Sequence, residues 1–122
     1  MSFYKIAFGK KGEEEAERIL KKQGYKIIEK NYRCRFGEID IIAKDGDTIA
    51  FVEVKTRVND RFGSPKSSVD YRKQKHITNA SAYYLNEKGL DDSSVRFDVV
   101  SLELGGDRFS FELIKDAFEA QE

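Results

Sequence analysis

The chain has 122 residues, of which 39% are hydrophobic and 36% charged, and its 22 basic and 22 acidic side chains cancel. This length allows one domain, and the apolar fraction is sufficient for a packed core, which excludes a disordered chain. The single cysteine, Cys34, excludes an internal disulfide and a cysteine-based metal site. Because the N-terminal stretch lacks the apolar run of a signal peptide and no later segment could span a membrane, we expect a cytoplasmic protein with no membrane partner.

Charge is distributed unevenly along this neutral chain. Residues 53–76 carry 7 Lys and Arg against 3 Asp and Glu, whereas residues 77–122 carry 4 against 10. A basic middle segment can form a face that binds a polyanion even when the net charge is zero. Ordinary solvated surface can be equally uneven, so the distribution supports a nucleic-acid partner only when combined with a site.

Hydrophobic periodicity and turn residues predict seven elements. In chain order they are a helix over 12–23, strands over 25–32, 37–43 and 48–56, a helix over 69–87, and strands over 95–104 and 109–114. The order α-β-β-β-α-β-β predicts an α+β (mixed α/β) fold with a central mixed sheet flanked by helices. We expect one domain over 1–115, followed by an acidic tail over 116–122 that is frayed or weakly helical.

Helical spacing also predicts which side chains face the core. The expected inward faces consist of Ala16, Ile19 and Leu20 on the first helix, and of Ile77, Ala80 and Tyr84 on the second. We interpret Tyr83, like Tyr84, as support for the core, and we place His76 on an exposed helix face.

The two strands around the turn Asp45-Gly46-Asp47 carry acidic and basic residues at alternate positions. Side chains alternate between the faces of a strand, so Glu38 and Asp40 are expected on one face, and Ile39 and Ile41 on the other. By the same rule Glu53 and Lys55 share one face of the following strand.

The tight turn makes these two strands neighbours, so Asp40 and Glu53 can approach each other. Two close carboxylates disfavour each other's ionisation, and a divalent cation removes that penalty. Mg²⁺ prefers oxygen ligands and keeps several waters, so two carboxylates would suffice. Lys55 would point at the same site, where its ammonium could neutralise a phosphate or orient an attacking water.

A simpler interpretation of the same pattern remains open. Charged residues that alternate with apolar ones on a hairpin usually form the solvent face of a sheet, and the spacing Asp-x12-Glu-x-Lys alone favours that interpretation. The composition of the second strand argues against it, because Ile49 and Phe51 share the face of Glu53. A carboxylate beside such neighbours should be partly buried, which favours pairing or metal binding.

Two segments, GEIDIIA at 37–43 and FVEVKTR at 51–57, closely resemble the YraN-like (UPF0102) family of small bacterial proteins. That family is similar to archaeal Holliday-junction resolvases and belongs to the PD-(D/E)XK nuclease superfamily. The resemblance covers nearly the whole chain, including GxxGExxAxxxL at 9–20, NYR at 31–33, FGSP at 62–65, Val69 with Lys73, and RFDVV at 96–100. Ile39 replaces the superfamily's proline, which supplies neither a ligand nor a proton.

The resemblance implies a restriction-endonuclease-like core and a site that uses Mg²⁺ or Mn²⁺. Asp40 and Glu53 take the positions of the two acidic metal ligands, and Lys55 that of the catalytic lysine. Glu13 matches a helix glutamate of resolvase-like members that contacts a metal or a metal-bound water, although acids at a helix start are also favoured by the helix dipole. Glu38 either assists catalysis, as a base or a further ligand, or pairs on the surface with Arg33 or Arg35.

We therefore expect a metal-dependent endonuclease that hydrolyses phosphodiester bonds in DNA, with branched DNA as the substrate that the resemblance suggests. Lysines and arginines supply salt-sensitive affinity for phosphate that is independent of sequence. The candidate nucleic-acid contacts are Arg33, Arg57, Arg61, Arg72, Lys73 and Lys75. Two alternative functions are a catalytically weak nucleic-acid-binding module of the same fold and a protein-interaction domain whose acidic tail recruits a partner.

The expected assembly depends on the substrate. An enzyme that cuts two strands of a symmetric junction needs two sites related by a two-fold axis, so a resolvase-like role predicts a homodimer, whereas a flap nuclease could act as a monomer. The strands over 95–104 and 109–114 are expected at an open, apolar sheet edge that could pair with a second copy.

Overall fold

The structure is a computed structural model that describes residues 3–57, 69–105 and 108–121, with the backbone alone for residues 3–8. Its elements are α1 (Phe3–Lys22), β1 (Lys26–Cys34), β2 (Gly37–Asp45), β3 (Thr48–Arg57), α2 (Tyr71–Glu87), β4 (Ser94–Gly105) and β5 (Arg108–Ile114). The predicted element order and mixed α/β class are confirmed, and the architecture is consistent with a restriction-endonuclease-like core. Neither described helix combines the length and apolar character needed to cross a bilayer.

The five strands form one sheet in the order β1-β2-β3-β4-β5. β3 and β4 pair in parallel and the other neighbours are antiparallel. A parallel pair needs a long crossover, which contains α2. The expectation that both late strands lie at the sheet edge is wrong for β4, since it is enclosed by β3 and β5, and only β5 is an edge strand.

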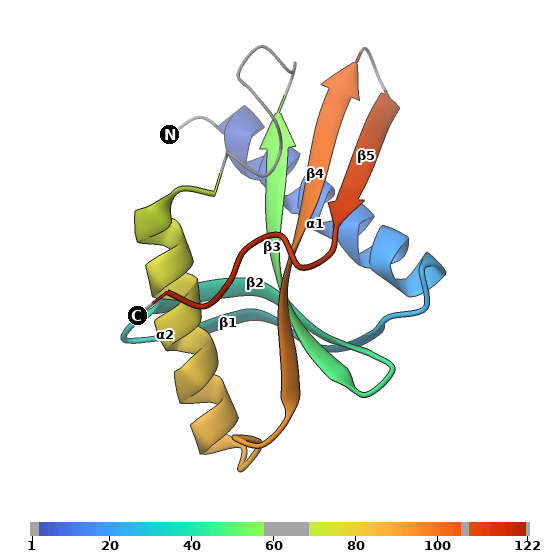
Figure 1. Ribbon diagram of the computed structural model, residues 1–122. Coiled ribbons are helices and arrows are strands. Elements are labelled where there is room, and N and C mark those ends of the chain that lie inside the picture. The colour runs from blue at the N-terminus through green and yellow to red at the C-terminus, as the bar shows by residue number, and fades with distance from the viewer. Residues whose placement is uncertain (1–2, 58–68, 106–107, 122) are drawn as a thin grey trace.

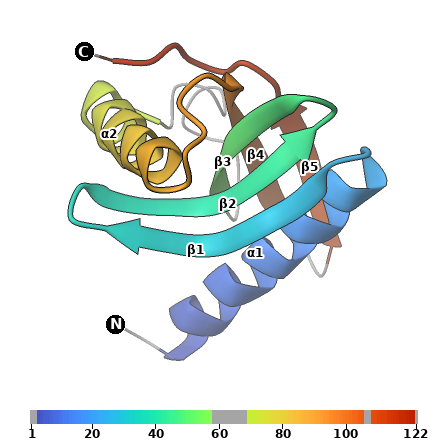
Figure 2. The ribbon, with the colours of Figure 1, turned by 90° about the horizontal axis from the view of Figure 1, so that it is seen from below.

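The two helices cover opposite faces of the sheet (Figure 1 and Figure 2). α1 begins at Phe3, so the prediction of a start at residue 12 is wrong: the glycines at 9 and 12 weaken the helical pattern, yet one continuous helix runs through both. α2 begins at Tyr71 because the side chain of Asp70 caps it, accepting a hydrogen bond from Lys73 N at 2.8 Å.

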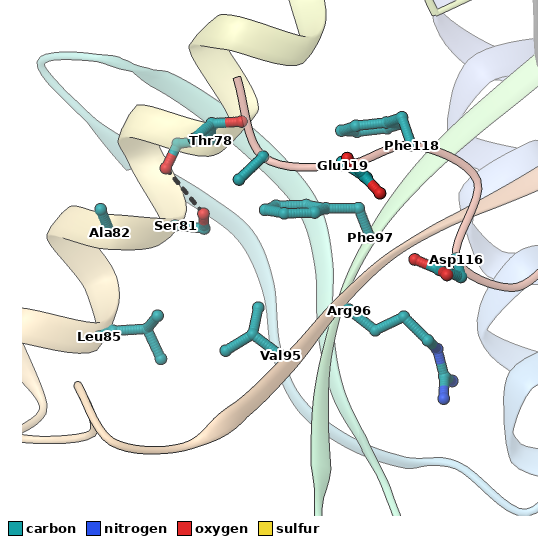
Figure 3. Close-up of a pocket in the computed structure, with 11 residues that line it drawn as sticks. Thr78, Ser81, Ala82, Leu85, Val95, Arg96, Phe97, Asp116, Phe118 and Glu119 are labelled. Carbon is teal, nitrogen blue, oxygen red and sulfur yellow. Dashed lines mark hydrogen bonds between the residues drawn. The ribbon is translucent and has the colours of Figure 1, made fainter. Parts of the chain in front are cut away.

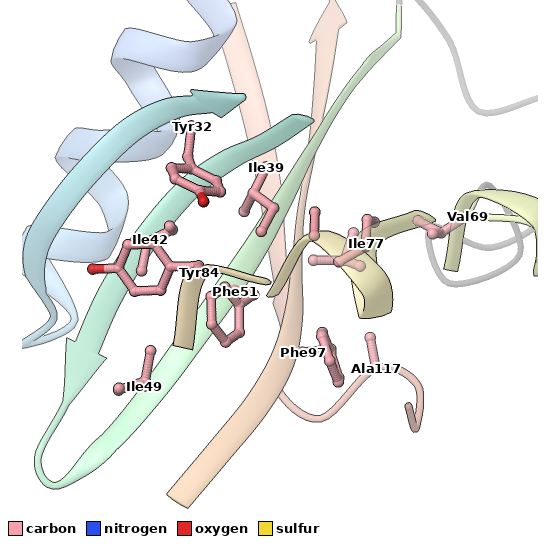
Figure 4. Packing of buried hydrophobic residues seen from close by; sticks show 12 residues of the cluster. Tyr32, Ile39, Ile42, Ile49, Phe51, Val69, Ile77, Tyr84, Phe97 and Ala117 are labelled. Carbon is pink, nitrogen blue, oxygen red and sulfur yellow. The ribbon is translucent and has the colours of Figure 1, made fainter. Parts of the chain in front are cut away.

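The core on the α2 side is rich in aromatic rings (Figure 4). Tyr84 packs edge-on against Tyr32 and Phe51, with ring centroids 5.1 and 5.9 Å away, and Ile77 and Tyr84 are buried as predicted. The assignment of Tyr83 to the core is wrong. Its side chain is 40% exposed, because it follows Tyr84 on the helix and points off the buried face.

On the α1 side, the predicted face of Ala16, Ile19 and Leu20 packs on the sheet. The approach of this helix to β3 is close at Gly12, where an added Cβ would lie 2.5 Å from Thr56 Oγ1. A residue larger than glycine would force either the Thr56 side chain or the helix to shift. Gly12 therefore fixes the position of the next residue, Glu13, over the sheet.

The predicted alternation of β2 breaks at Asp40. Ile39 belongs to the core on the α2 side, whereas Ile41 belongs to the core on the α1 side, so the expectation that they share a face is wrong. Across the ladder the same switch occurs around Asn31, which has a φ of 54°. A left-handed residue reverses the side on which the next side chain leaves a strand. Asn31 lies between the rungs that pair Lys30 with Ile41 and Tyr32 with Ile39.

The C-terminal tail is ordered against the domain, so the expectation of a frayed or weakly helical segment is wrong for residues 116–121. Ala117 is fully buried and its amide donates to Phe97 O at 2.7 Å. Phe118 stacks on Phe97 with centroids 5.1 Å apart, and Gln121 N donates to Thr78 Oγ1 on α2. The tail, β4 and α2 line an open, mostly apolar pocket of about 370 Å³ (Figure 3).

A buried polar network anchors the start of this tail. Asp98 on β4 is fully buried and accepts hydrogen bonds from Tyr25 Oη at 2.7 Å, from Arg96 Nε at 2.8 Å and from Asp116 N at 3.0 Å. Arg96 also reaches Asp45 at 2.8 Å. The network thereby joins the connection between α1 and β1, the end of β2 and the tail.

Replacing Asp98 with alanine should destabilise the fold by roughly 3–5 kcal/mol, since it leaves Arg96 partly buried with its main partner removed. Urea unfolding followed by circular dichroism measures the difference from wild type. Asp92→Ala is the control because Asp92 is exposed. Equal losses in the two variants would show that the network contributes nothing specific.

Candidate metal and active centre

The centre lies where β2 and β3 stop pairing. Their ladder runs from Asp45 opposite Thr48 to Ile41 opposite Val52. The next residues along the two strands are Asp40 and Glu53. Val54 N donates to Asp40 Oδ2 at 2.8 Å, so the carboxylate takes a main-chain hydrogen bond from β3 just beyond the last paired residues. This bond holds Asp40 against β3, in agreement with the prediction that the two strands are neighbours.

Glu53 is the most buried acidic residue of this centre, with a side chain only 5% exposed. It lies beyond Ile49 and Phe51, which pack in the α2-side core and confirm the predicted apolar surroundings. Two ammonium groups approach the same oxygen, Glu53 Oε2: Lys55 Nζ at 3.7 Å and Lys73 Nζ at 3.5 Å. Lys55 is therefore at the expected place, and Lys73 of α2 belongs to the centre rather than to outlying surface.

The two carboxyl groups are electrostatically coupled. Burial, followed by the negative charge of Glu53, raises the pKa of Asp40 from 3.8 to about 8. The hydrogen bond from Val54 and the charge of Lys73 oppose this shift of the pKa but do not cancel it. At neutral pH the Asp40–Glu53 pair accordingly retains a proton, as expected for two carboxyls that cannot both ionise cheaply.

Glu13 faces Asp40 from the α1 side. Both residues line a small pocket of about 120 Å³, together with Lys10, Lys30 and Asn31. Burial first, then the charges of Asp40 and Glu38, raise the pKa of Glu13. The structure thus brings the helix glutamate to the predicted centre, and the pocket has room for several waters.

Asn31 is a member of this centre that the sequence analysis missed as a functional residue. With its side-chain nitrogen turned towards the acids, it donates to Glu13 Oε1 at 3.2 Å and to Glu38 Oε1 at 3.3 Å. Asparagine tolerates the left-handed backbone better than most residues, which is the one signal that could have identified it. Glu38 also pairs with Arg33, whose Nε lies 3.5 Å from Glu38 Oε2, so the surface pairing considered for it is present.

The other predicted nucleic-acid contacts differ in exposure. Arg33, Arg72 and Lys75 are exposed, Arg57 is partly buried, and Arg61 lies outside the described residues. His76 is exposed as predicted. Arg72, Lys73 and Lys75 all lie in the first turns of α2, and of these three Lys73 is the one that pairs with Glu53.

The donor set suits a hard divalent cation such as Mg²⁺ or Mn²⁺. Asp40 and Glu53 offer carboxylate oxygens on adjacent strands, and Glu13 offers a third across the pocket. Within the described ranges, no three His, Cys, Asp or Glu side chains stand close enough together to form a complete metal cage. Mg²⁺ commonly binds through one or two carboxylates and retains its waters, so Asp40 and Glu53 would be direct ligands and Glu13 would act through water.

Comparisons with known proteins match the chain to one family. Residues 12–102 match the model of the family described as "Uncharacterised protein family UPF0102". The chain is 55% identical over 111 residues to a UPF0102 protein of Syntrophus aciditrophicus, covering 91% of this chain and 87% of that protein. It is 51% identical to one from Desulfosudis oleivorans (93% and 90% covered) and 46% identical to one from Clostridium perfringens (97% and 98% covered).

The raised pKa of Asp40 predicts a pH-dependent stability in the absence of metal. Between pH 3.8 and about 8 the folded protein keeps a proton that the unfolded chain releases. The stability contributed by that proton is complete below the lower value and is lost as the pH rises through the upper one. Asp40→Asn, which cannot ionise, should therefore gain stability relative to wild type as the pH rises from 5 to 9.

Urea unfolding in EDTA across that range measures the effect. Asp47→Asn, in the exposed β2–β3 turn, is the matched control. If the free energy of unfolding changes with pH equally in wild type and Asp40→Asn, the folded protein does not keep a proton on the carboxyl pair.

Proposed function

The chain belongs to the UPF0102 family, and from its carboxylate centre we propose that it is a divalent-metal-dependent nuclease that hydrolyses phosphodiester bonds in DNA. The observation that carries the proposal is the convergence of Asp40 and Glu53 at the point where β2 and β3 part. The ionisation of both carboxyl groups is costly, and Lys55 approaches one oxygen of Glu53. An ordinary solvent-facing sheet surface does not explain this arrangement. Such perturbed groups cluster at functional sites.

The proposed chemistry assigns a separate task to each group. Asp40 and Glu53 would hold the ion, which supplies Lewis acidity and a more acidic bound water. Lys55, 3.7 Å from Glu53 Oε2, would hold the attacking water or neutralise charge that develops on the phosphate. Glu13 would orient water on the α1 side, and the Val54 amide keeps Asp40 in place as the charge around it changes.

DNA as the substrate class is supported by basic residues on the helix that reaches the centre. Arg72 and Lys75 are exposed on the first turns of α2, the helix whose Lys73 reaches Glu53. A phosphate backbone bound there would run past the carboxyl pair. Contacts of this kind position a duplex without reading its sequence, so we propose that selectivity comes from the shape of the DNA, with branched DNA as the leading substrate.

A nucleic-acid-binding module of the same fold is the second candidate. Two features favour it: the described residues form no complete metal cage, and both Lys55 and Lys73 already neutralise Glu53. A protein with this arrangement could bind DNA through α2 without cutting it.

The cleavage test separates the two candidates. Wild type should cut four-way, flapped or linear DNA in Mg²⁺ or Mn²⁺, with RNA included in the panel. Lys55→Ala should lower the rate by roughly 10²–10³-fold and leave DNA affinity nearly unchanged, because it acts on the transition state. Lys75→Ala should weaken binding and reduce its salt slope by about one unit.

Asp92→Asn is the control for a surface charge change. If wild type binds DNA tightly but cuts none of the substrates in either metal, the second candidate replaces the first.

The proposed action on a junction further predicts a homodimer. The edge strand β5 carries Phe111 with half of its surface exposed, which offers a second copy an apolar contact at the edge of the sheet. Sedimentation velocity at micromolar concentration, with and without junction DNA, should show a dimer that Phe111→Lys weakens. A monomer in both conditions would rule out paired cutting of a junction while leaving a single-cut nuclease.

A further inference from the structure

Two lysine ammonium groups lie beside the Glu53 carboxylate, whereas the proposed chemistry uses only one of them. Lys73 Nζ is closer to Glu53 Oε2 than Lys55 Nζ is, at 3.5 against 3.7 Å, and the carboxylate is 5% exposed. Lys73 also opposes the raised pKa of Asp40 by its charge, so it acts on both members of the carboxyl pair. A divalent ion held by that pair would occupy the region towards which this ammonium points.

We infer that Lys73 is a built-in counter-cation, which neutralises the Asp40–Glu53 pair until a divalent ion displaces its ammonium group from Glu53. The inference rests on the proposed metal site, and it adds that Lys73 lowers the affinity of this site for the metal ion. A buried carboxylate without a partner is costly, so the metal-free protein benefits from a tethered positive charge. The same charge repels an incoming ion, and metal loading must therefore work against it.

The placement of Lys73 makes displacement feasible without unfolding the helix. Its backbone is fixed, since Lys73 N donates to the capping carboxylate of Asp70 at 2.8 Å. Its side chain is 40% exposed, against 31% for Lys55, so the long stem can swing towards solvent while α2 stays in place. Lys55 projects from the central strand β3 and has less freedom to leave.

The test compares metal affinity in the full chain without nucleic acid. Calorimetric titration with Mn²⁺ would be carried out on wild type, Lys73→Met and Lys73→Arg. Removing one unit charge a few ångströms from a divalent ion should tighten Mn²⁺ binding by about tenfold in Lys73→Met. Lys73→Arg keeps the charge and should stay close to wild type.

Lys44→Met is the matched control, because it removes the same charge from an exposed position on β2, the strand that carries Asp40. The melting temperature without metal provides a second measurement. It should fall in Lys73→Met, where Glu53 loses a partner, and Mn²⁺ should raise it by more than in wild type. Lys73→Gln gives the same comparison with a polar side chain if the methionine variant folds poorly.

The outcomes separate this inference from the proposed function. If wild type binds Mn²⁺ and the neutral Lys73 variants bind it equally or more weakly, Lys73 is not a counter-cation and the metal site stands. If neither wild type nor any variant binds Mn²⁺, the metal site itself is wrong, and the role of Lys73 falls with it.

Discussion

The hydrogen bond from Val54 N to Asp40 Oδ2 holds a carboxylate at the point where two central strands separate, and the rest of the centre is arranged around the consequences. It fixes Asp40 beside Glu53 in a buried place, where both carboxyls cannot ionise without a large penalty. Lys55 and Lys73 offset the charge of Glu53, and the amide of Asn31 bridges Glu13 and Glu38 on the other side of the pocket. We propose that a site held in this way binds a cation, because the positive charge would relieve the cost of ionising both carboxyl groups.

The parts of this centre that the sequence predicted are those set by short-range rules. The turn at 45–47 pins the register of its hairpin, so the proximity of Asp40 and Glu53 follows from counting residues on either side. The burial of Glu53 follows from Ile49 and Phe51 on the same face of a regular strand. Element order and mixed sheet followed from hydrophobic periodicity, and the resemblance to the family supplied the restriction-endonuclease-like core.

The parts that could not be predicted depend on long-range packing or on one unusual backbone angle. Nothing local to Lys73 indicates that α2 carries it to a carboxylate twenty residues earlier, since the helix direction is set by the packing of Tyr84 and Ile77. The alternation rule assumes an extended strand, and it fails on β1 at the left-handed Asn31 and on the neighbouring β2 at Asp40, which separates Ile39 from Ile41. The sequence predicts a frayed or weakly helical tail, but its apolar residues Ala117 and Phe118 pack on β4, a contact between positions about twenty residues apart that local sequence rules do not report.

The most direct measurement of a shared proton and a shared cation is the number of protons released when Mn²⁺ binds. At pH 6.5 the metal-free pair retains the proton of Asp40, whose pKa is raised to about 8, and a metal ligand must be deprotonated. Calorimetric titration in two buffers of different ionisation enthalpy should therefore give close to one proton released per Mn²⁺ in wild type, and close to none in Asp40→Asn. Equal proton release in the two proteins, or binding without any release, would contradict the convergence of Asp40 and Glu53 on one ion.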